Sequence, residues 1–148
     1  MSKIKSFRGN IADDGIDTIV LHTNDGSTGY RMVRFEVMAD DFTKDSNAVV
    51  LVNKVKPATA SSTIDFNNQV LLAAAFYSKS DTPHNHPEDM NVIFDSEIFN
   101  QDIYISYKNV LTSNPPNINY YIELEQIKLD LNENTVATLK DIRNIEAQ

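Results

Sequence analysis

Two histidines two positions apart, His84 and His86, are the residues of this chain whose types and spacing best suit chemistry. On an extended backbone their imidazoles would project to one side, and neutral imidazole is a common ligand of transition metals. Glu88 and Asp89 follow too closely to complete the same site, and the remaining histidine, His22, lies near the start of the chain. We therefore expect a solvated, proline-containing loop without a bound metal.

Acidic residues form three further groups that could hold a cation or move a proton. Glu123 and Glu125 would point to the same side of a strand, where two carboxylates can act as acid and base, as in glycosidases. The run 130–134 with Asp141 has some of the oxygen-ligand spacing of an EF-hand loop but lacks its glycine, and the run 13–17 is a short acidic turn. We interpret the three groups as a solvated strand face, a helix cap and a turn.

Four tyrosines could stack on a sugar or insert into a partner, although we assign them to the core and the sheet faces. The four glycines, Gly9, Gly15, Gly26 and Gly29, cannot supply a dinucleotide-binding or phosphate-binding loop, and the absence of cysteine excludes a thiolate nucleophile and a cysteine-ligated zinc. We expect a protein that is not an enzyme, with no catalytic residues, no cofactor and no metal. The tyrosines are Tyr104, Tyr107, Tyr120 and Tyr121.

The overall charge limits the partners of the chain. A formal net charge of −8 and a pI near 4.7 would repel polyanions, so we expect no binding to nucleic acid or to an anionic membrane. The longest apolar run, Val70 to Tyr77, is too short to span a bilayer, and the N-terminus lacks the apolar segment of a signal peptide. We expect a soluble, unprocessed protein.

Alternating and β-branched residues predict strands at Ile16 to Thr23 and Tyr30 to Met38, joined as a hairpin by a glycine-containing turn. A second pair is predicted at Asp102 to Lys108 and Ile118 to Leu129, across an Asn-Pro-Pro-Asn turn. The apolar parity changes within Ile118 to Leu129, which predicts a bulge near Glu125 and a bend between two sheets.

Other strands are predicted at Asn47 to Val55 and from Val92 onward, and Gln69 to Tyr77 is expected to be a buried strand despite its helix-forming alanines. The segment Ser78 to Asn91 is expected to be an exposed loop.

A short amphipathic helix is expected at about residues 132–145, where Val136, Leu139, Ile142 and Ile145 would share one side. Together these elements predict an all-β fold, an antiparallel β-sandwich or jelly-roll-like barrel with a short C-terminal helix, as one domain over residues 1–148.

Several strings also resemble small virion-associated structural proteins of marine bacteriophages: residues 11–19, 23–31, 99–104 and 119–143. The resemblance implies a particle component present in many copies that joins or decorates capsid subunits. Its partners would be other virion proteins and copies of itself in a homo-oligomer or symmetric assembly, and its location the virion, assembled in the host cytoplasm. A tail, neck or baseplate component is the alternative, as is a module that binds a receptor or carbohydrate through its loops.

Overall fold

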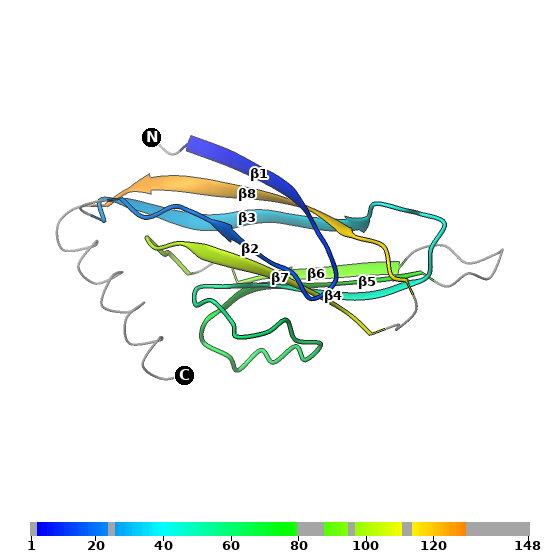
Figure 1. Cartoon of the computed structure of the whole chain (residues 1–148). Coiled ribbons are helices and arrows are strands. Elements are labelled where there is room, and N and C mark those ends of the chain that lie inside the picture. Colours follow the sequence, from blue (N-terminus) through cyan, green and yellow to red (C-terminus); the bar gives the residue numbers. More distant parts are fainter. Residues whose placement is uncertain (1–2, 24–25, 80–87, 95–96, 111–113, 130–148) are drawn as a thin grey trace.

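Eight β-strands form two antiparallel sheets that lie face to face (Figure 1). The structure is a computed structural model and describes residues 3–23, 26–79, 88–94, 97–110 and 114–129. The strands are β1 (Lys3–Ile11), β2 (Ile16–Ile19), β3 (Thr28–Ala39), β4 (Ser46–Asn53), β5 (Leu71–Lys79), β6 (Glu88–Ile93), β7 (Ile103–Asn109) and β8 (Ile118–Lys128). None of these described residues forms a helix, so none forms a helix that is long and apolar enough to cross a membrane.

The smaller sheet has the order β1-β8-β3, with β8 in the centre. Ile122 of β8 lies opposite Phe7 of β1 and opposite Phe35 of β3, which aligns their side chains on the inner face. The pairing of β3 with β8 shifts between Met32 and Arg34, so Val33 is an extra residue in the strand. This bulge lets apolar residues on both sides of it face the core.

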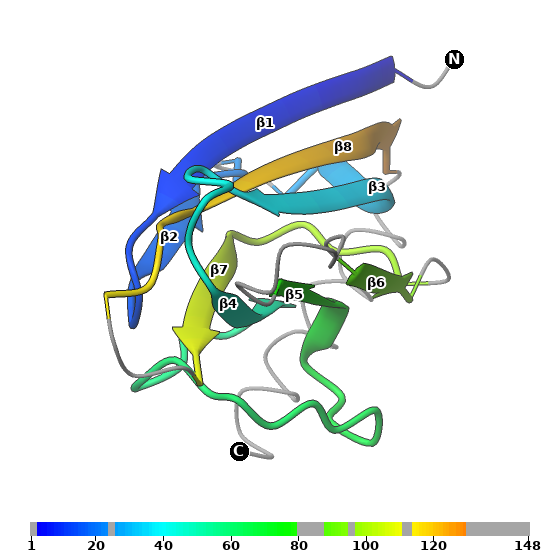
Figure 2. The same ribbon diagram turned by 90° about the vertical axis from the view of Figure 1, so that its right-hand side faces the viewer.

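The larger sheet has the order β2-β7-β4-β5-β6. Its central strands are apolar on both faces, because the sheet packs against β3 on one side while segment 54–70 passes over the other (Figure 2). Such a strand lacks strict alternation, which explains the continuous apolar run at the start of β5. Leu51, Leu71 and Ala74 form a small buried cluster on this outer face, with Val49 and Phe94 packed against it.

The main core lies between the two sheets. Buried side chains from both sheets meet there, and burial of this apolar surface is the main stabilising contribution to the fold. The largest fully buried side chains are Tyr107, Phe35, Phe99, Met32, Leu72, Ile103, Ile105, Ile118, Ile122 and Leu124.

The all-β prediction and the antiparallel sheets are confirmed. The segment predicted as a strand at Gln69 to Tyr77 is β5, in spite of its alanines, because Ala73 and Ala75 face the densely packed core. The loop predicted over Ser78 to Asn91 is shorter at both ends, since β5 continues to Lys79 and β6 begins at Glu88. The helix predicted at 132–145 lies outside the described residues and stays a prediction.

Both predicted hairpins are wrong. β2 and β3 lie in different sheets, as do β7 and β8. In each case the chain crosses from one sheet to the other, so β2 pairs with β7 and β3 pairs with β8. Turn residues allow the chain to reverse, but they do not decide whether the next strand pairs with the last one or covers its face.

The predicted bulge is also misplaced. Pairing of β8 with β1 and β3 continues without a shift through Glu125 and Gln126, and the bulge lies at Val33 of the neighbouring strand. The alternation of Val33, Phe35 and Val37 with Arg34, Glu36 and Met38 predicts that the first three are buried. Phe35 and Val37 are buried, but the bulge leaves Val33 exposed, so that part of the prediction is wrong. No strand was predicted over β1, because its charged residues make the apolar face of the strand difficult to recognise in the sequence.

Candidate functional site

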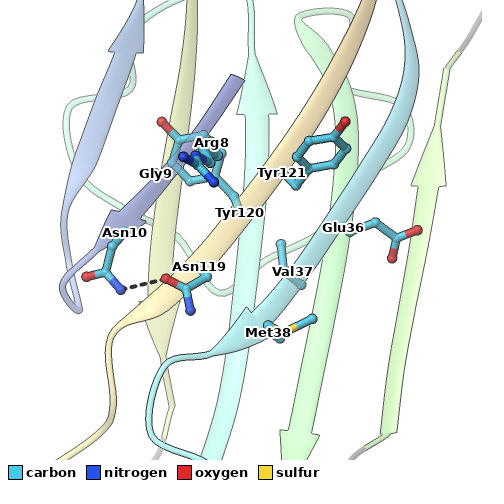
Figure 3. A pocket seen from close by; sticks show the side chains of 9 residues that line it. All are labelled: Arg8, Gly9, Asn10, Glu36, Val37, Met38, Asn119, Tyr120 and Tyr121. Carbon is cyan, nitrogen blue, oxygen red and sulfur yellow. Dashed lines mark hydrogen bonds between the residues drawn. The ribbon is translucent and has the colours of Figure 1, made fainter. Parts of the chain in front are cut away.

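A hollow of about 550 Å³ lies on the smaller sheet, at the end where β1 and β3 finish and β8 begins (Figure 3). All three strands contribute to its lining. The lining residues are Arg8, Gly9, Asn10, Glu36, Val37, Met38, Asn119, Tyr120 and Tyr121. We take this hollow as the candidate site.

Strand alternation decides which of these side chains faces outward. Arg8, Tyr121 and Glu36 are directly opposite one another across the three strands, and their row faces away from the core. Two residues along, a second outward row holds Asn10, Asn119 and Met38. The row between them, Gly9, Tyr120 and Val37, faces the core and lines the hollow from beneath.

Hydrogen bonds fix the amide side of the hollow. Asn10 Nδ2 donates to Asn119 Oδ1 at 2.8 Å and to Asp40 Oδ2 at 3.3 Å. Asn117 Nδ2 in turn donates to Asn10 Oδ1 at 2.8 Å. The amides are thereby oriented before any ligand arrives, which lowers the entropic cost of binding one.

A ladder of charged side chains continues along the same outer face. Arg31 Nη2 donates to Glu125 Oε1 at 2.8 Å, and Arg34 Nη1 donates to Glu123 Oε2 at 3.4 Å. Tyr121 Oη also donates to Glu123 Oε2, at 2.7 Å, and the Arg34 guanidinium lies 5.4 Å from the centre of the Tyr121 ring.

The prediction that Glu123 and Glu125 share one strand face is confirmed. Each carboxylate already accepts a hydrogen bond from an arginine, and Glu123 accepts a second from Tyr121. The two carboxylates therefore belong to a polar sheet surface and have partners within the same sheet.

Tyr120 connects the two sheets from beneath the hollow. Its ring passes under Gly9, where an added Cβ would lie 2.6 Å from the ring atoms, and its hydroxyl donates to Asp17 Oδ2 of β2 at 3.1 Å. Burial and the adjacent Asp17 carboxylate raise the pKa of Tyr120 to about 12. The residue is therefore a structural clamp, and Gly9 provides the space it needs.

The other tyrosines also match the assignment to core and sheet faces. Tyr107 is fully buried, donates to the Pro116 carbonyl at 2.7 Å and accepts from Asn109 Nδ2 at 2.9 Å. Tyr120 and Tyr121 point to opposite faces of β8. The four rings thus form no single aromatic surface.

The acidic turn at residues 13–17 is confirmed as a turn. Asp14 has a φ of 65°, a conformation that aspartate tolerates better than most residues. Asp13 Oδ1 accepts from the amide of Asn109 and Asp14 Oδ1 accepts from Lys108 Nζ, each at 2.7 Å. Protein donors thus hold these carboxylates, and the turn ties the start of β2 to the end of β7.

A histidine and aspartate pair that the sequence analysis missed lies between β2 and β7. Asp102 Oδ1 accepts hydrogen bonds from the amides of Leu21 and His22 at 2.8 and 3.0 Å and is 2.7 Å from His22 Nδ1. Burial opposes ionisation of Asp102, but the hydrogen bonds from His22 and Leu21 outweigh it and hold its pKa below the usual value. The two residues are 80 positions apart, so sequence spacing gave no signal.

The remaining predicted ligands divide between described and undescribed parts of the chain. Glu88 and Asp89 are exposed at the start of β6. His84, His86, the run 130–134 and Asp141 lie outside the described residues. Within the parts that are described, no group of three or more histidine, cysteine, aspartate or glutamate side chains is placed to hold a metal ion.

Comparison with known proteins adds no functional assignment. The sequence matches no protein-family model and no curated protein sequence. The chemistry of the described residues must therefore be interpreted from their geometry. The hollow offers a guanidinium, oriented amides and one aromatic ring, which are groups that bind polar ligands or another protein surface.

Proposed function

We propose that this chain is a non-enzymatic structural protein of a bacteriophage particle, which joins or decorates capsid subunits. The observation that carries the proposal is the strand order. The pairs β1 with β8, β2 with β7 and β4 with β5 are those of one long antiparallel hairpin, and the contacts of β8 with β3 and of β7 with β4 arise when that hairpin is rolled up.

This arrangement supports a jelly-roll-like fold, which is common in viral capsid domains. In a regular jelly roll β6 would pair with β3, whereas here β6 pairs with β5 and contacts β3 across the core. The same fold also occurs in lectins and in enzymes of the cupin class, so the fold alone does not fix the function.

Among a structural protein, a lectin and a cupin enzyme, the surface chemistry favours the structural protein. The outward carboxylates of β8 are in ion pairs with arginines, and the acidic turn is hydrogen-bonded to β7. The sequence resemblance to virion-associated proteins points the same way. The proposed partners are other virion proteins and copies of itself, with no nucleic acid and no membrane, and the proposed location is the virion. A tail, neck or baseplate position remains the alternative within the particle.

Purified particles test the proposal directly. We expect quantitative mass spectrometry of phage particles purified on a density gradient to find the chain at a fixed ratio to the major capsid protein. Particles separated into heads and tails would then distinguish capsid decoration from a tail position. Absence of the chain from infectious particles, with abundant chain in the infected cell, would contradict the proposal.

The hollow supports a second candidate function, the binding of a receptor carbohydrate. Tyr121 offers an aromatic ring beside Arg8, Asn10 and Asn119, a combination that can stack on a sugar ring and hydrogen-bond its hydroxyls. A glycan-array screen of the purified chain tests this function, with Tyr121→Ala as the site variant and Tyr104→Ala as the control. Binding that survives Tyr121→Ala would place any sugar site elsewhere.

A further inference from the structure

Two edge strands of opposite charge, β1 and β6, each form the edge of one sheet. β1 ends the smaller sheet, and β6 ends the larger sheet on the side that lies against β3, away from β1 (Figures 1 and 2). Each pairs with a single neighbour within the described residues. Among the described residues, the backbone N–H and C=O groups along the other side of each strand form no sheet pairing, and such an edge can accept a further strand.

The exposed parts of these strands match in length and differ in charge. The first four residues of β1, from Lys3 to Ser6, are exposed on both faces, and so are the first four residues of β6, from Glu88 to Asn91. The first set carries Lys3 and Lys5, whereas the second carries Glu88 and Asp89. These four charged side chains form no ion pair within the described parts of the chain.

We propose that β1 of one copy pairs with β6 of a second copy, as an antiparallel continuation of the sheet. This inference rests on the proposed structural role and names its partner and contact surface. Each copy would use one basic edge and one acidic edge, so the contact is heterologous and can continue from copy to copy in a ring or row.

One antiparallel register satisfies both the apolar and the charged residues. With Ile4 opposite Met90, Lys5 lies opposite Asp89 and Ser6 lies opposite Glu88. Ile4 and Met90 are 53% and 65% exposed in the single chain, so pairing would bury two of its most exposed apolar side chains. In the same register Arg8 is diagonal to Glu88, which adds a second contact between opposite charges.

The same charges disfavour pairing between two β1 edges or between two β6 edges. Two β1 strands would bring lysines together, and two β6 strands would bring carboxylates together, so like edges repel. Lysine residues on an edge strand normally prevent it from pairing with strands of other molecules. An acidic edge strand can still pair with it, because the opposite charges attract.

Charge reversal on each edge tests the inference in the purified full chain. We expect wild-type protein to associate in sedimentation velocity as its concentration rises, and to dissociate as salt is added. Both the K3E/K5E variant and the E88K/D89K variant should associate at least about tenfold more weakly. The K56E/K108E variant, with the same change in net charge as K3E/K5E on residues of neither edge strand, should associate like wild type.

Mixing supplies the decisive measurement. The K3E/K5E variant has two acidic edges and the E88K/D89K variant has two basic edges, so an equimolar mixture should associate more strongly than either variant alone. Circular dichroism of each variant checks that both remain folded. Association that never forms, that survives both reversals or that mixing does not restore would overturn the inference.

The particle experiment separates failure of this inference from failure of the proposed function. Normal incorporation of the K3E/K5E variant into virions would overturn β1–β6 pairing and leave the structural role intact. Conversely, restored association of the mixed variants, with no chain in purified particles, would support the pairing and contradict the virion role.

Discussion

At the scale of single residues, the smaller sheet depends on the missing side chain at Gly9. A glycine inside a strand normally costs stability, because it loses more backbone freedom on folding than alanine does. Here the Tyr120 ring occupies the space that a Cβ would need, and its hydroxyl reaches Asp17 in the other sheet. Steric exclusion at this position therefore outweighs the usual gain from alanine.

We expect Gly9→Ala to lower the free energy of unfolding by about 1–3 kcal/mol, because the Tyr120 ring has to move from its packed position. Urea unfolding measures the change. In a Tyr120→Leu background the same Gly9→Ala substitution should be neutral or stabilising, because the ring contact is gone. An equal cost in both backgrounds would show that the ring is not the cause.

Asp102 makes a second single-residue contribution, and this one depends on pH. Its pKa in the folded protein lies below the unfolded value, so its stabilising effect is present above about pH 4 and is lost as the pH falls through the folded pKa. We expect Asp102→Asn to lower the free energy of unfolding by about 1–2 kcal/mol at pH 6. Urea unfolding at pH 6 and pH 3 should show that difference shrinking at the lower pH. The exposed Asp45→Asn serves as control, and a cost for Asp102→Asn that is equal at both pH values would contradict the assignment.

At the scale of elements, a buried ion pair connects the end of β4 to the segment before β7. Lys54 Nζ lies 2.7 Å from Glu97 Oε1, and the Lys54 side chain is only 2% exposed. An ion pair of this kind adds little stability compared with well-packed apolar residues, but removing one partner leaves a buried charge. The exposed pair of Arg34 and Glu123 lacks that penalty.

We therefore expect Glu97→Ala to cost more stability than Glu123→Ala, which should cost about 1 kcal/mol or less. Thermal unfolding followed by circular dichroism compares the two. The double variant Lys54→Met with Glu97→Gln should recover much of the loss, since it removes the buried ammonium together with the carboxylate. A Glu97→Ala melting temperature close to that of Glu123→Ala would contradict a larger contribution from the buried pair.

At the scale of the whole molecule, the two sheets are held together by contacts between distant parts of the sequence. β1 pairs with β8, and Tyr120 and Asp17, which join the sheets, are 103 positions apart. β8 lies in the centre of the smaller sheet, so the chain cannot complete that sheet until its last described strand is present. We expect folding to be cooperative and slow compared with proteins built from local contacts.

The predicted terminal helix belongs to the same scale. If it covers this domain's own sheet, removal of the residues after Leu131 should lower the free energy of unfolding by several kcal/mol, because large apolar side chains lose their burial. Chemical unfolding of the truncated monomer measures this. Unchanged stability, together with lost incorporation into oligomers or particles, would show that the segment contacts a partner instead.

The sequence by itself determined the type and approximate place of most strands. Alternation of Val33, Phe35 and Val37 with polar residues identified the buried face of β3 except at Val33, which the bulge exposes, because side chains on a strand point to opposite faces in turn. The same periodicity correctly placed Glu123 and Glu125 on one polar face of β8. These features depend on neighbouring residues alone, so they can be inferred locally.

The tertiary structure alone decided which strands pair and which side chains meet. Backbone hydrogen bonds have the same donors and acceptors in every strand, so β2 and β3 could be predicted as strands but not assigned to different sheets. The pair of His22 and Asp102 and the clamp of Tyr120 over Gly9 likewise arise from packing between distant segments. Their physical basis is the burial of apolar surface between two sheets, which selects one long-range arrangement from many that local patterns allow.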